Sequence, residues 1–325
     1  MPVITVLEAI RDAMREEMRK DERVFVMGED IGARGGVFLA TDGFLSEFGE
    51  ERVIDTPLAE SSIAGIALGS AMSGLRPIAE IEFADFIWPT INQIVGEASK
   101  VRYGTEGKLQ APMVLRAPQG GGVRGALYHS QSVEALFAHT PGLKVVTPST
   151  PYDAKGLLKA SIRDDDPVFV VNDKKLINMT GFVPDEDYRI ELGKGRYLRK
   201  GSDVTLVGMS YTSVVCKEAA EKLEKLDIDA EVIDLMSLSP LDEQIIIESV
   251  SKTNRIVIVD EDNPRASMAS EIAAIVSDKA FDYLDAPVKR VTAPHTPVPY
   301  SKGLEDEFMP DSDDVVQTVK NILDI

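Results

Sequence analysis

The chain has 325 residues, enough for about two domains that each bury a substantial core. Its 54 acidic and 35 basic residues give a formal net charge of −19, which excludes unassisted nucleic-acid binding because phosphates require a basic surface. The one cysteine, Cys216, excludes an internal disulfide and a cysteine-cluster metal site. No apolar run approaches the roughly 20 residues that span a bilayer, so we expect a soluble, cytoplasmic protein.

Helical patterns alternate with short apolar runs in the first half of the chain. We expect helices over residues 5–18, 61–72, 88–103 and 151–163, and strands over residues 23–28, 77–83, 112–117, 143–148 and 167–172. Thr5 and Glu8 have the spacing of a capping box, and Thr150 followed by Pro151 predicts a second helix start. This alternation is typical of an α/β domain with a mainly parallel sheet.

The periodicity fades between about residues 173 and 201, where polar residues, glycine and proline accumulate. A second alternation follows, with strands expected over residues 203–209, 230–235, 255–260 and 288–294, helices between them, and a last helix over residues 313–323. We therefore predict two α/β domains, residues 1–190 and residues 191–325. Cys216 falls in an expected helix, which predicts a small core residue.

Glu60 precedes a segment that is apolar around its whole circumference, as an internal helix is. Its apolar residues are Ile63, Ala64, Ile66, Ala67, Leu68, Ala71 and Met72. Gly65 and Gly69 each lower helix stability by roughly 1 kcal/mol, which indicates that a backbone or a ligand packs closely there. Partial burial of the Glu60 carboxyl would raise its pKa, which makes this residue a candidate for proton transfer.

The alternative is that Glu60 only occupies the first turn of a helix that starts with Thr56 as N-cap and Pro57 as the first helical residue. Acidic residues are common in first turns because they interact favourably with the helix dipole. This segment by itself therefore favours the structural interpretation of Glu60.

The glycine spacing of GGGVRG, residues 120–125, matches that of a dinucleotide-binding loop. Its context does not fit, because Pro118 interrupts the approach, no strong helix begins at Gly125, and no acidic residue follows about twenty positions on. We expect instead a flexible loop at the border of a site. His129 follows in this loop, and a catalytic and a structural role fit its position equally well.

Other enzyme classes have less support in the sequence. Neither a GxSxG nor a GxxxxGK[ST] motif occurs, so serine hydrolases and P-loop enzymes lose their best signal. The run from Arg163 to Asp166 first predicts a solvated helix end and only second an oxygen-ligand site for a hard cation.

Four blocks together resemble the beta subunit of the thiamine-diphosphate-dependent first component of 2-oxo acid dehydrogenase complexes. They are MGED at residues 27–30, DTPLAESSIAGIALGSAMSGLRPIAEIEFADF at 55–86, HSQSVEALFAHTPGLKVVTPSTPYDAKGLL at 129–158 and PHTPVPYS at 294–301. The resemblance covers essentially the whole chain, and it implies a pyrimidine-binding α/β domain followed by a transketolase C-terminal-like domain. The implied activity is oxidative decarboxylation of a 2-oxo acid, with acyl transfer to the lipoyl group of a second component.

The resemblance assigns the cofactor contacts to the first domain and favours the catalytic interpretation of Glu60. It implies that Glu60 hydrogen-bonds the aminopyrimidine ring of thiamine diphosphate and so promotes deprotonation of the thiazolium, the electron sink of the reaction. Phe86 is expected to stack on the pyrimidine, Leu58 and Ala59 to line the cofactor, and Glu29 to lie nearby.

Further residues receive roles from the same resemblance. His129 is expected to move protons or to orient the intermediate for transfer to the lipoyl group. Glu82 stands where relatives often have glutamine, and places a second acid near the cofactor. A potassium ion is implied at the backbone oxygens of Met113, Ser161, Ile162 and Asp164 and at Asp166, where relatives often have asparagine.

The chain lacks the GDG segment and following asparagine that hold Mg²⁺ and diphosphate in thiamine enzymes, and in this family that half lies on an alpha subunit. The resemblance therefore implies an α2β2 heterotetramer and an inactive isolated beta chain. The acidic charge favours docking to a basic peripheral domain of the second component. A branched-chain 2-oxo acid or pyruvate is the expected substrate. Acetoin dehydrogenase, a transketolase-type two-carbon transferase half and a non-catalytic scaffold are the alternatives.

Overall fold

The computed structural model describes residues 2–325, which form two compact units. The first unit runs to Gln119 and continues from Leu136 to Leu192, and the second comprises residues 120–135 and 193–325. The loop that carries His129 thus groups with the second unit, although it lies far before the expected boundary near residue 190. Within residues 2–325, no helix combines the length and the apolar character that crossing a membrane requires.

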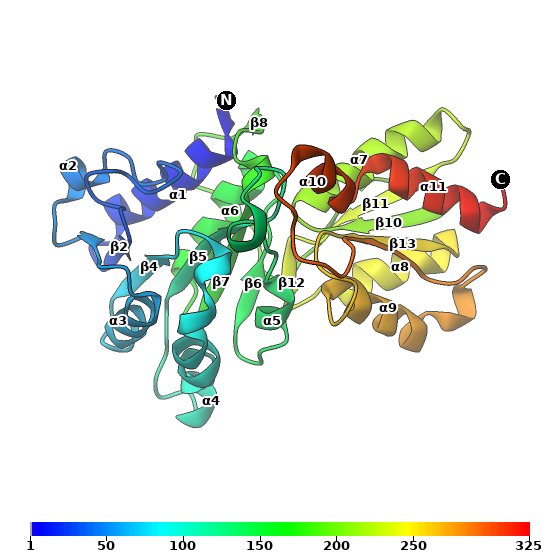
Figure 1. The fold of residues 1–325 in the computed structure, drawn as a ribbon. Coiled ribbons are helices and arrows are strands. Elements are labelled where there is room, and N and C mark those ends of the chain that lie inside the picture. The colour runs from blue at the N-terminus through cyan, green and yellow to red at the C-terminus, as the bar shows by residue number, and fades with distance from the viewer. Residues whose placement is uncertain (1) are drawn as a thin grey trace. The chain divides into compact units, whose positions relative to one another are not determined.

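The first unit is built on a sheet whose strands pair in the order β6-β7-β5-β4-β2-β3, every pair parallel (Figure 1). The short strands β1 and β8 pair antiparallel in a separate ribbon. In chain order the elements of this unit are β1 (Val3–Thr5), α1 (Val6–Lys20), β2 (Val24–Gly28), α2 (Phe44–Phe48), β3 (Val53–Asp55), α3 (Glu60–Met72), β4 (Arg76–Glu80), α4 (Val101–Gly104), β5 (Val114–Gln119), β6 (Lys144–Val146), α6 (Pro151–Arg163), β7 (Val168–Asp173) and β8 (Thr180–Phe182).

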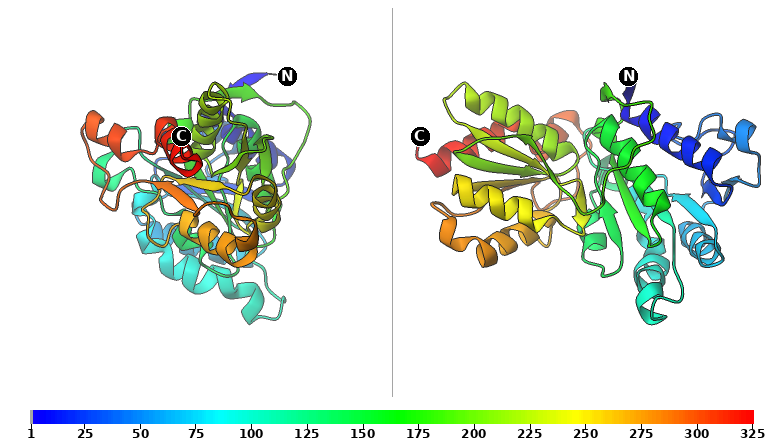
Figure 2. Two further views of the ribbon diagram at one scale, coloured as in Figure 1. Left: turned by 90° about the vertical axis from the view of Figure 1, so that its right-hand side faces the viewer. Right: turned by 180° about the vertical axis from the view of Figure 1, so that it is seen from behind.

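Helices α1 and α6 pack side by side in the first unit (Figure 2). The start of α1 is the predicted capping box: the N–H of Glu8 donates to Thr5 Oγ1 at 3.1 Å, and the N–H of Thr5 donates to the Glu8 carboxylate at 2.7 Å. Thr150 caps α6 as predicted. Across the two helices, the buried Lys159 binds the Glu16 carboxylate at 2.6 Å. Local sequence signals therefore predicted the starts of both helices. The ion pair between Lys159 and Glu16 joins the two helices.

The single α-helix expected over residues 88–103 is wrong. The segment comprises a 3-10 turn over Trp88–Thr90, a π-helical stretch over Asn92–Glu97, a second 3-10 turn over Ala98–Lys100 and the short helix α4. Pro89 and Gly96 lie inside the segment, and both residue types weaken regular α-helical hydrogen bonding. Apolar spacing over such short pieces does not distinguish 3-10, α and π turns.

Helix α3 is buried on one side only, which corrects the expectation of a helix buried all round. The residues of its buried face are Ile63, Ala64, Ala67, Leu68 and Ala71. On the opposite face Ile66 is 54% exposed and Met72 is 41% exposed. A Cβ atom at Gly69 would meet nothing within 4 Å, so no close contact in the described chain accounts for this glycine. An evenly apolar sequence cannot indicate which face the chain itself covers.

The second unit has a sheet in the order β14-β13-β10-β11-β9, parallel except for β9. Helices α7 and α11 cover one face of this sheet, and α8 and α9 cover the other (Figure 1). Cys216 is buried in the apolar cluster around α7 and α11, as predicted for a small core residue. Burial raises the pKa of its thiol. In chain order the elements are β9 (Arg196–Arg199), β10 (Val204–Gly208), α7 (Tyr211–Glu224), β11 (Ala230–Asp234), β12 (Ser237–Ser239), α8 (Glu243–Thr253), β13 (Ile256–Asp260), α9 (Met268–Lys279), β14 (Lys289–Thr292), α10 (Lys302–Phe308) and α11 (Ser312–Leu323).

Candidate active site

Three acidic residues converge at the carboxyl edge of the first unit's sheet. Strands β2 and β4 are parallel neighbours with Gly28 opposite Glu80, so both strands end at the same edge. Glu29 follows β2 directly, and Glu82 follows the end of β4. Glu60 begins α3, which follows β3, the strand on the other side of β2. This edge of an open α/β sheet is the usual location of ligand sites.

The extent of α3 agrees with the helix expected over residues 61–72, and not with the alternative start at Thr56 and Pro57. The helix begins at Glu60 with Ala59 as N-cap, and Thr56 and Pro57 lie outside it. Alanine offers no side-chain acceptor, so no side chain caps the first turn of α3. Glu60 is half-buried in this turn, as the catalytic interpretation expected.

The carboxyl groups of the site interact electrostatically. Burial raises the pKa of Glu29, and the negative charges of Glu60 and Asp30 raise it further. Burial likewise raises the pKa of Glu82, with added effects of Glu29 and Asp30 that Arg34 opposes. Glu29 and Glu82 therefore hold a proton at a higher pH than isolated carboxyls.

Apolar side chains border these acids. Leu58 is 73% exposed just before α3. Phe86 is half-buried, and its ring packs edge-to-face on Phe83 with the centroids 5.8 Å apart. Phe83 in turn packs on Phe38 at 5.6 Å. Aromatic and aliphatic groups next to a few polar groups form the lining that binding of a heterocyclic ring requires.

Sequence reasoning missed a buried ion pair between Glu80 and Arg116, which are 6% and 1% exposed. The two residues lie opposite each other on the parallel strands β4 and β5. Arg116 Nε also donates to Asn172 Oδ1 on β7 at 3.0 Å. The available signal was a charged residue flanked by apolar neighbours in each of two expected strands, since buried charges are rare unless paired. The pair joins β4 to β5 just before Glu82.

Several residues expected to hold potassium lie together at the end of α6, where cationic side chains of the protein already bind them. Arg76 donates to the carbonyl oxygens of Ile162 at 3.0 Å and Asp164 at 2.8 Å, and it binds the Asp165 carboxylate at 2.5 Å. Lys144 binds the Asp164 carboxylate at 2.7 Å. A carbonyl oxygen has two lone pairs, so each of these carbonyls retains room for a second partner.

The remaining expected ligands are also hydrogen-bonded. Asp166 forms an ion pair with Arg102, and the carbonyl oxygens of Met113 and Ser161 accept backbone N–H groups. In the described part of the chain, no group of three or more His, Cys, Asp or Glu side chains is placed to hold a metal ion. The potassium site stays a prediction.

The glycine loop over residues 120–125 is held by carboxylates, in contrast to the flexible loop expected. The N–H of Gly121 donates to Glu261 at 2.5 Å. The N–H groups of Gly122 and Arg124 both donate to Glu305 Oε1 at 3.0 Å. These donors, which a dinucleotide loop would direct to phosphate, are therefore occupied by the protein itself.

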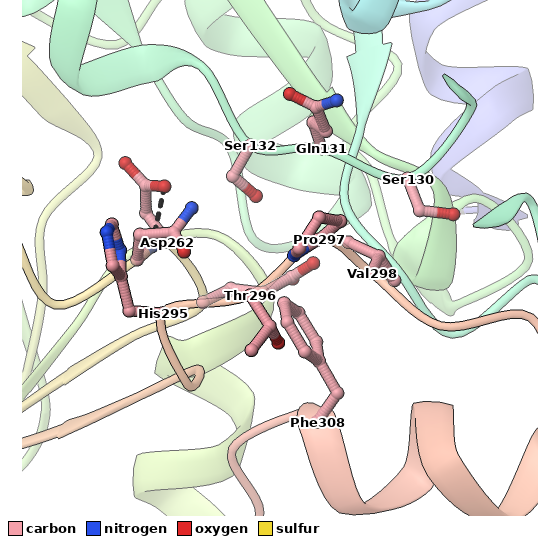
Figure 3. A pocket seen from close by; sticks show the side chains of 11 residues that line it. Ser130, Gln131, Ser132, Asp262, His295, Thr296, Pro297, Val298 and Phe308 are labelled. Carbon is pink, nitrogen blue, oxygen red and sulfur yellow. Dashed lines mark hydrogen bonds between the residues drawn. The ribbon is translucent and has the colours of Figure 1, made fainter. Parts of the chain in front are cut away.

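The segment after this loop borders a pocket of ≈ 300 Å³ in the second unit. His129 is half-buried, and the three residues after it contribute to the lining. Figure 3 shows Ser130 and Ser132 on one side of the pocket and His295 on the other. The full lining is Ser130, Gln131, Ser132, Glu261, Asp262, Asn263, His295, Thr296, Pro297, Val298 and Phe308.

Asp262, which lines this pocket, has a strongly raised pKa. Burial, together with the negative charge of the neighbouring Asp260, raises the pKa of Asp262 to about 7. Burial also raises the pKa of Asp260, which accepts the N–H groups of Asp262 and Ala269 at 3.0 and 2.9 Å. Sequence analysis assigned no role to Asp262 or His295, although His295 lies in the block PHTPVPYS that contributes to the family resemblance.

Comparisons with known proteins identify the family and the fold. Residues 3–180 match the family described as transketolase, pyrimidine binding domain, and residues 193–315 match transketolase, C-terminal domain. The protein is 51% identical to the 2-oxoisovalerate dehydrogenase subunit beta of Bacillus subtilis (strain 168) over 99% of both chains. It is 49% identical to the acetoin:2,6-dichlorophenolindophenol oxidoreductase subunit beta of the same organism, over 99% of this chain and 97% of that one. It is 45% identical to the Bacillus subtilis pyruvate dehydrogenase E1 component subunit beta over the whole of both chains.

The chain belongs to the transketolase-like family of beta subunits of the first component of 2-oxo acid dehydrogenase complexes, as the resemblance predicted. Membership implies thiamine diphosphate dependence and an oxidoreductase role in an alpha/beta component of a multienzyme complex. A solved structure described as a split gene transketolase, inactive beta4 tetramer, has a TM-score of 0.80 and 25% identity over 99% of this chain and 98% of that one. It confirms the predicted two-domain α/β fold. The relatives' names differ in substrate and do not select one for this chain.

Proposed function

We propose that this chain, with an alpha subunit, carries out the thiamine-diphosphate-dependent oxidative decarboxylation of a 2-oxo acid and passes the acyl group to the lipoyl group of a second component. The proposed substrate is a branched-chain 2-oxo acid or pyruvate, for which relatives at 51% and 45% identity are named. The observation that carries the proposal is the convergence of Glu29, Glu60 and Glu82 beside Leu58 in the first unit.

Glu60 is the proposed proton-handling residue. Its carboxyl group is half-buried at the sheet edge and interacts with Glu29, an environment in which a carboxyl can bind a ring nitrogen and exchange a proton with it. When bound, thiamine diphosphate would supply a thiazolium that accepts the electron pair released by decarboxylation.

The neighbouring side chains are proposed to orient the cofactor ring. Phe86 offers an aromatic face, braced by its edge-to-face contact with Phe83. Leu58 and Ala59 would cover the ring and keep water from Glu60. Glu82, whose pKa is raised by burial and by Glu29, is proposed to hydrogen-bond the ring.

His129 is proposed to move a proton, or to orient the acyl group, during transfer to the lipoyl group. It is half-buried in a loop whose backbone N–H groups donate to the carboxylates of Glu261 and Glu305, and its imidazole suits proton transfer near neutral pH. A histidine in a fixed loop keeps the orientation that such a transfer needs.

The alpha subunit is the proposed holder of Mg²⁺ and of the diphosphate, in an α2β2 assembly. The exposed apolar face of α3, with Ile66 and Met72, provides a surface of the kind that subunit interfaces cover. A precedent for a beta chain without activity of its own is the split gene transketolase described as an inactive beta4 tetramer. We propose that the isolated chain is inactive here too.

The acidic charge of the chain suggests two further binding partners, a basic protein domain and a potassium ion. The net charge of −19 would speed docking of a basic peripheral domain of the lipoyl-bearing second component and make it salt-sensitive. Potassium is proposed at the end of α6, where Asp164 and Asp166 lie. The cations Arg76 and Lys144 already bind this segment, so affinity for a further cation should be modest.

Acetoin dehydrogenase is the second candidate, because the beta subunit of an acetoin-oxidising relative is 49% identical. A two-carbon transferase half has weaker support, since the split transketolase is only 25% identical. A non-catalytic scaffold would not need Glu60, Phe86 and His129 together, nor half-buried acids with raised pKa near Glu60.

The test uses the chain co-expressed with its alpha subunit and loaded with thiamine diphosphate and Mg²⁺. Reduction of 2,6-dichlorophenolindophenol is measured with pyruvate, 2-oxoisovalerate and acetoin, which identifies the substrate. Glu60→Gln should lower kcat about 10²- to 10⁴-fold, while Glu51→Gln, at an exposed position of the same unit, should leave it unchanged. Near-normal turnover of Glu60→Gln with cofactor bound would disprove the proposed mechanism. Full activity of the isolated beta chain would disprove the proposed assembly.

A further inference from the structure

Glu305 on α10 directs a buried carboxylate at the backbone of the glycine loop. Its side chain is 2% exposed. Oε1 accepts the N–H groups of Gly122 and Arg124, each at 3.0 Å, and Oε2 lies 3.2 Å from the latter nitrogen. The adjacent N–H of Gly121 donates to Glu261, which is 8% exposed. Two buried carboxylates thus hold three N–H groups within four residues of one loop.

Stability alone does not account for this arrangement. A buried carboxylate loses several kcal/mol of hydration, and its hydrogen bonds offset that loss at best. An apolar side chain at position 305 would fill the space beside Phe308 and Met309, which belong to an apolar cluster, at no such cost. The carboxylate of Glu305 is therefore better explained by the glycine loop that it binds than by a contribution to folding stability.

The loop needs to be held, because its backbone is strained. Arg124 and Ala126 have φ angles of 61° and 56°, in the left-handed region that costs a non-glycine residue about 1 kcal/mol or more. The N–H of Gly120 donates to the carbonyl of Gln131 at 3.1 Å and closes the base of the loop. Without the carboxylates, the closed loop would relax toward unstrained conformations.

The strained part of the loop touches His129 directly. A Cβ atom at Gly125 would lie 2.5 Å from the His129 carbonyl oxygen and 2.7 Å from its Cβ. The N–H of His129 also lies 3.4 Å from the Ala126 carbonyl. A shift of residues 122–126 therefore moves His129 with them.

We propose that Glu305 is a positioning residue, whose carboxylate fixes the glycine loop so that His129 is presented in the orientation acyl transfer requires. This inference rests on the proposed role of His129 and extends it to a residue of α10. Glu261 assists at Gly121. Glu305 touches neither substrate nor cofactor in this role.

The experiment compares four variants of the alpha/beta enzyme loaded with thiamine diphosphate. They are Glu305→Ala, Glu305→Gln, His129→Ala and, as a matched control on the exposed side of α10, Glu307→Ala. Hydrogen–deuterium exchange of the peptide covering residues 120–131 reports the loop. Turnover with a lipoyl acceptor, separated into kcat and KM for the 2-oxo acid, reports the reaction. Size-exclusion chromatography verifies that each variant assembles.

Glu305→Ala should speed exchange in this peptide about tenfold, because hydrogen bonds to a charged group are lost. It should lower kcat about 10- to 100-fold with little change in KM, as misplacement of a reacting group does. Glu305→Gln keeps an oxygen acceptor and should recover part of both losses. His129→Ala should lower kcat with exchange unchanged, and Glu307→Ala should match the wild type.

The outcomes separate this inference from the function on which it rests. Unchanged exchange in Glu305→Ala overturns the inference, because the carboxylate then does not hold the loop. Faster exchange with normal kcat, while His129→Ala is impaired, also overturns it, because the loop then does not position His129. Normal turnover of His129→Ala instead removes the proposed role of His129 itself, whatever Glu305→Ala does.

Discussion

Glu60 lies close enough to Glu29 for its negative charge to add to the effect of burial in raising the pKa of Glu29. Replacing Glu60 by Gln removes that charge, so the pKa of Glu29 should fall toward that of an isolated glutamate. Titration of carboxyl-¹³C signals in the glutamate-labelled chain measures this, with Glu29→Gln to assign the resonance. A Glu29 resonance that titrates identically in both proteins would show that the two acids are not coupled.

The buried pair of Glu80 and Arg116 should be costly to break. Arg116→Met leaves the Glu80 carboxylate buried without its partner, so the free energy of unfolding in urea should fall by about 3–5 kcal/mol. The control is Lys108→Met, which removes the cation from a pair with Glu106 whose side chains are 77% and 84% exposed. That change should cost less than about 0.5 kcal/mol. Equal losses of unfolding free energy in the two variants would show that the pair of Glu80 and Arg116 is no more important for stability than an exposed pair.

Asp262 should give stability an unusual pH dependence. In the folded chain its pKa is about 7, whereas an unfolded aspartate titrates near 3.9. Between these values the folded state binds more protons than the unfolded state, so this residue makes the chain less stable as pH rises from about 4 to 7. Asp262→Asn removes this pH dependence. The difference in unfolding free energy, variant minus wild type, should therefore be larger at pH 8 than at pH 4 by at least about 1 kcal/mol.

The measurement for Asp262 is the free energy of unfolding of both proteins in urea across this pH range. The difference between variant and wild type should be smallest near pH 4 and level off above pH 7. A difference that stays constant with pH would mean that Asp262 titrates normally in the folded chain.

Potassium should stabilise the enzyme if it binds at the end of α6. At equal ionic strength, KCl should raise the unfolding midpoint above that in NaCl, and each 1 kcal/mol gained corresponds to about 2–4 °C. Asp166→Ala should abolish the difference. Asp165→Ala is the matched control, because Asp165 pairs with Arg76 but is not an expected ligand. An identical KCl effect in both variants would place the ion elsewhere.

The exposed face of α3 should matter for assembly and little for folding. Ile66→Lys, at a side chain 54% exposed, should change the stability of the isolated chain by less than about 0.5 kcal/mol. Binding to the alpha subunit should weaken at least about tenfold, because the interface would bury an unpaired charge. Calorimetric titration measures this, with Leu226→Lys, at a side chain 47% exposed in the second unit, as control. Unimpaired binding of Ile66→Lys would remove α3 from the interface.

Much of the fold followed from local signals. The capping box of Thr5 and Glu8 and the Thr150 cap lie where predicted, since such signals depend on residues three or four positions apart. The family and its two-domain fold were predicted from long ordered blocks of sequence and are confirmed. The individual site residues remain predictions, although the structure gathers Glu29, Glu60 and Glu82 in one unit.

Other features escaped sequence reasoning for identifiable reasons. The alternative start of α3 at Thr56 and Pro57 is wrong, because these residues form a good helix-start pattern that the chain does not use. The all-round apolar pattern of α3 could not reveal that Ile66 and Met72 face outward. The spacing of apolar residues cannot distinguish the 3-10, π and α turns around Pro89 and Gly96 from one continuous α-helix.

The sequence by itself determined most of the longer helices and strands, the α/β class and the family, because periodicity, caps and long motifs depend on residues close together in the chain. Only the tertiary structure decided which charges are paired and which loops are held. Glu305 and Gly122 are 183 positions apart in the chain, and Glu80 and Arg116 are 36 apart. Whether such groups meet depends on the three-dimensional path of the backbone, and a buried charge is stable only where that path supplies its partner.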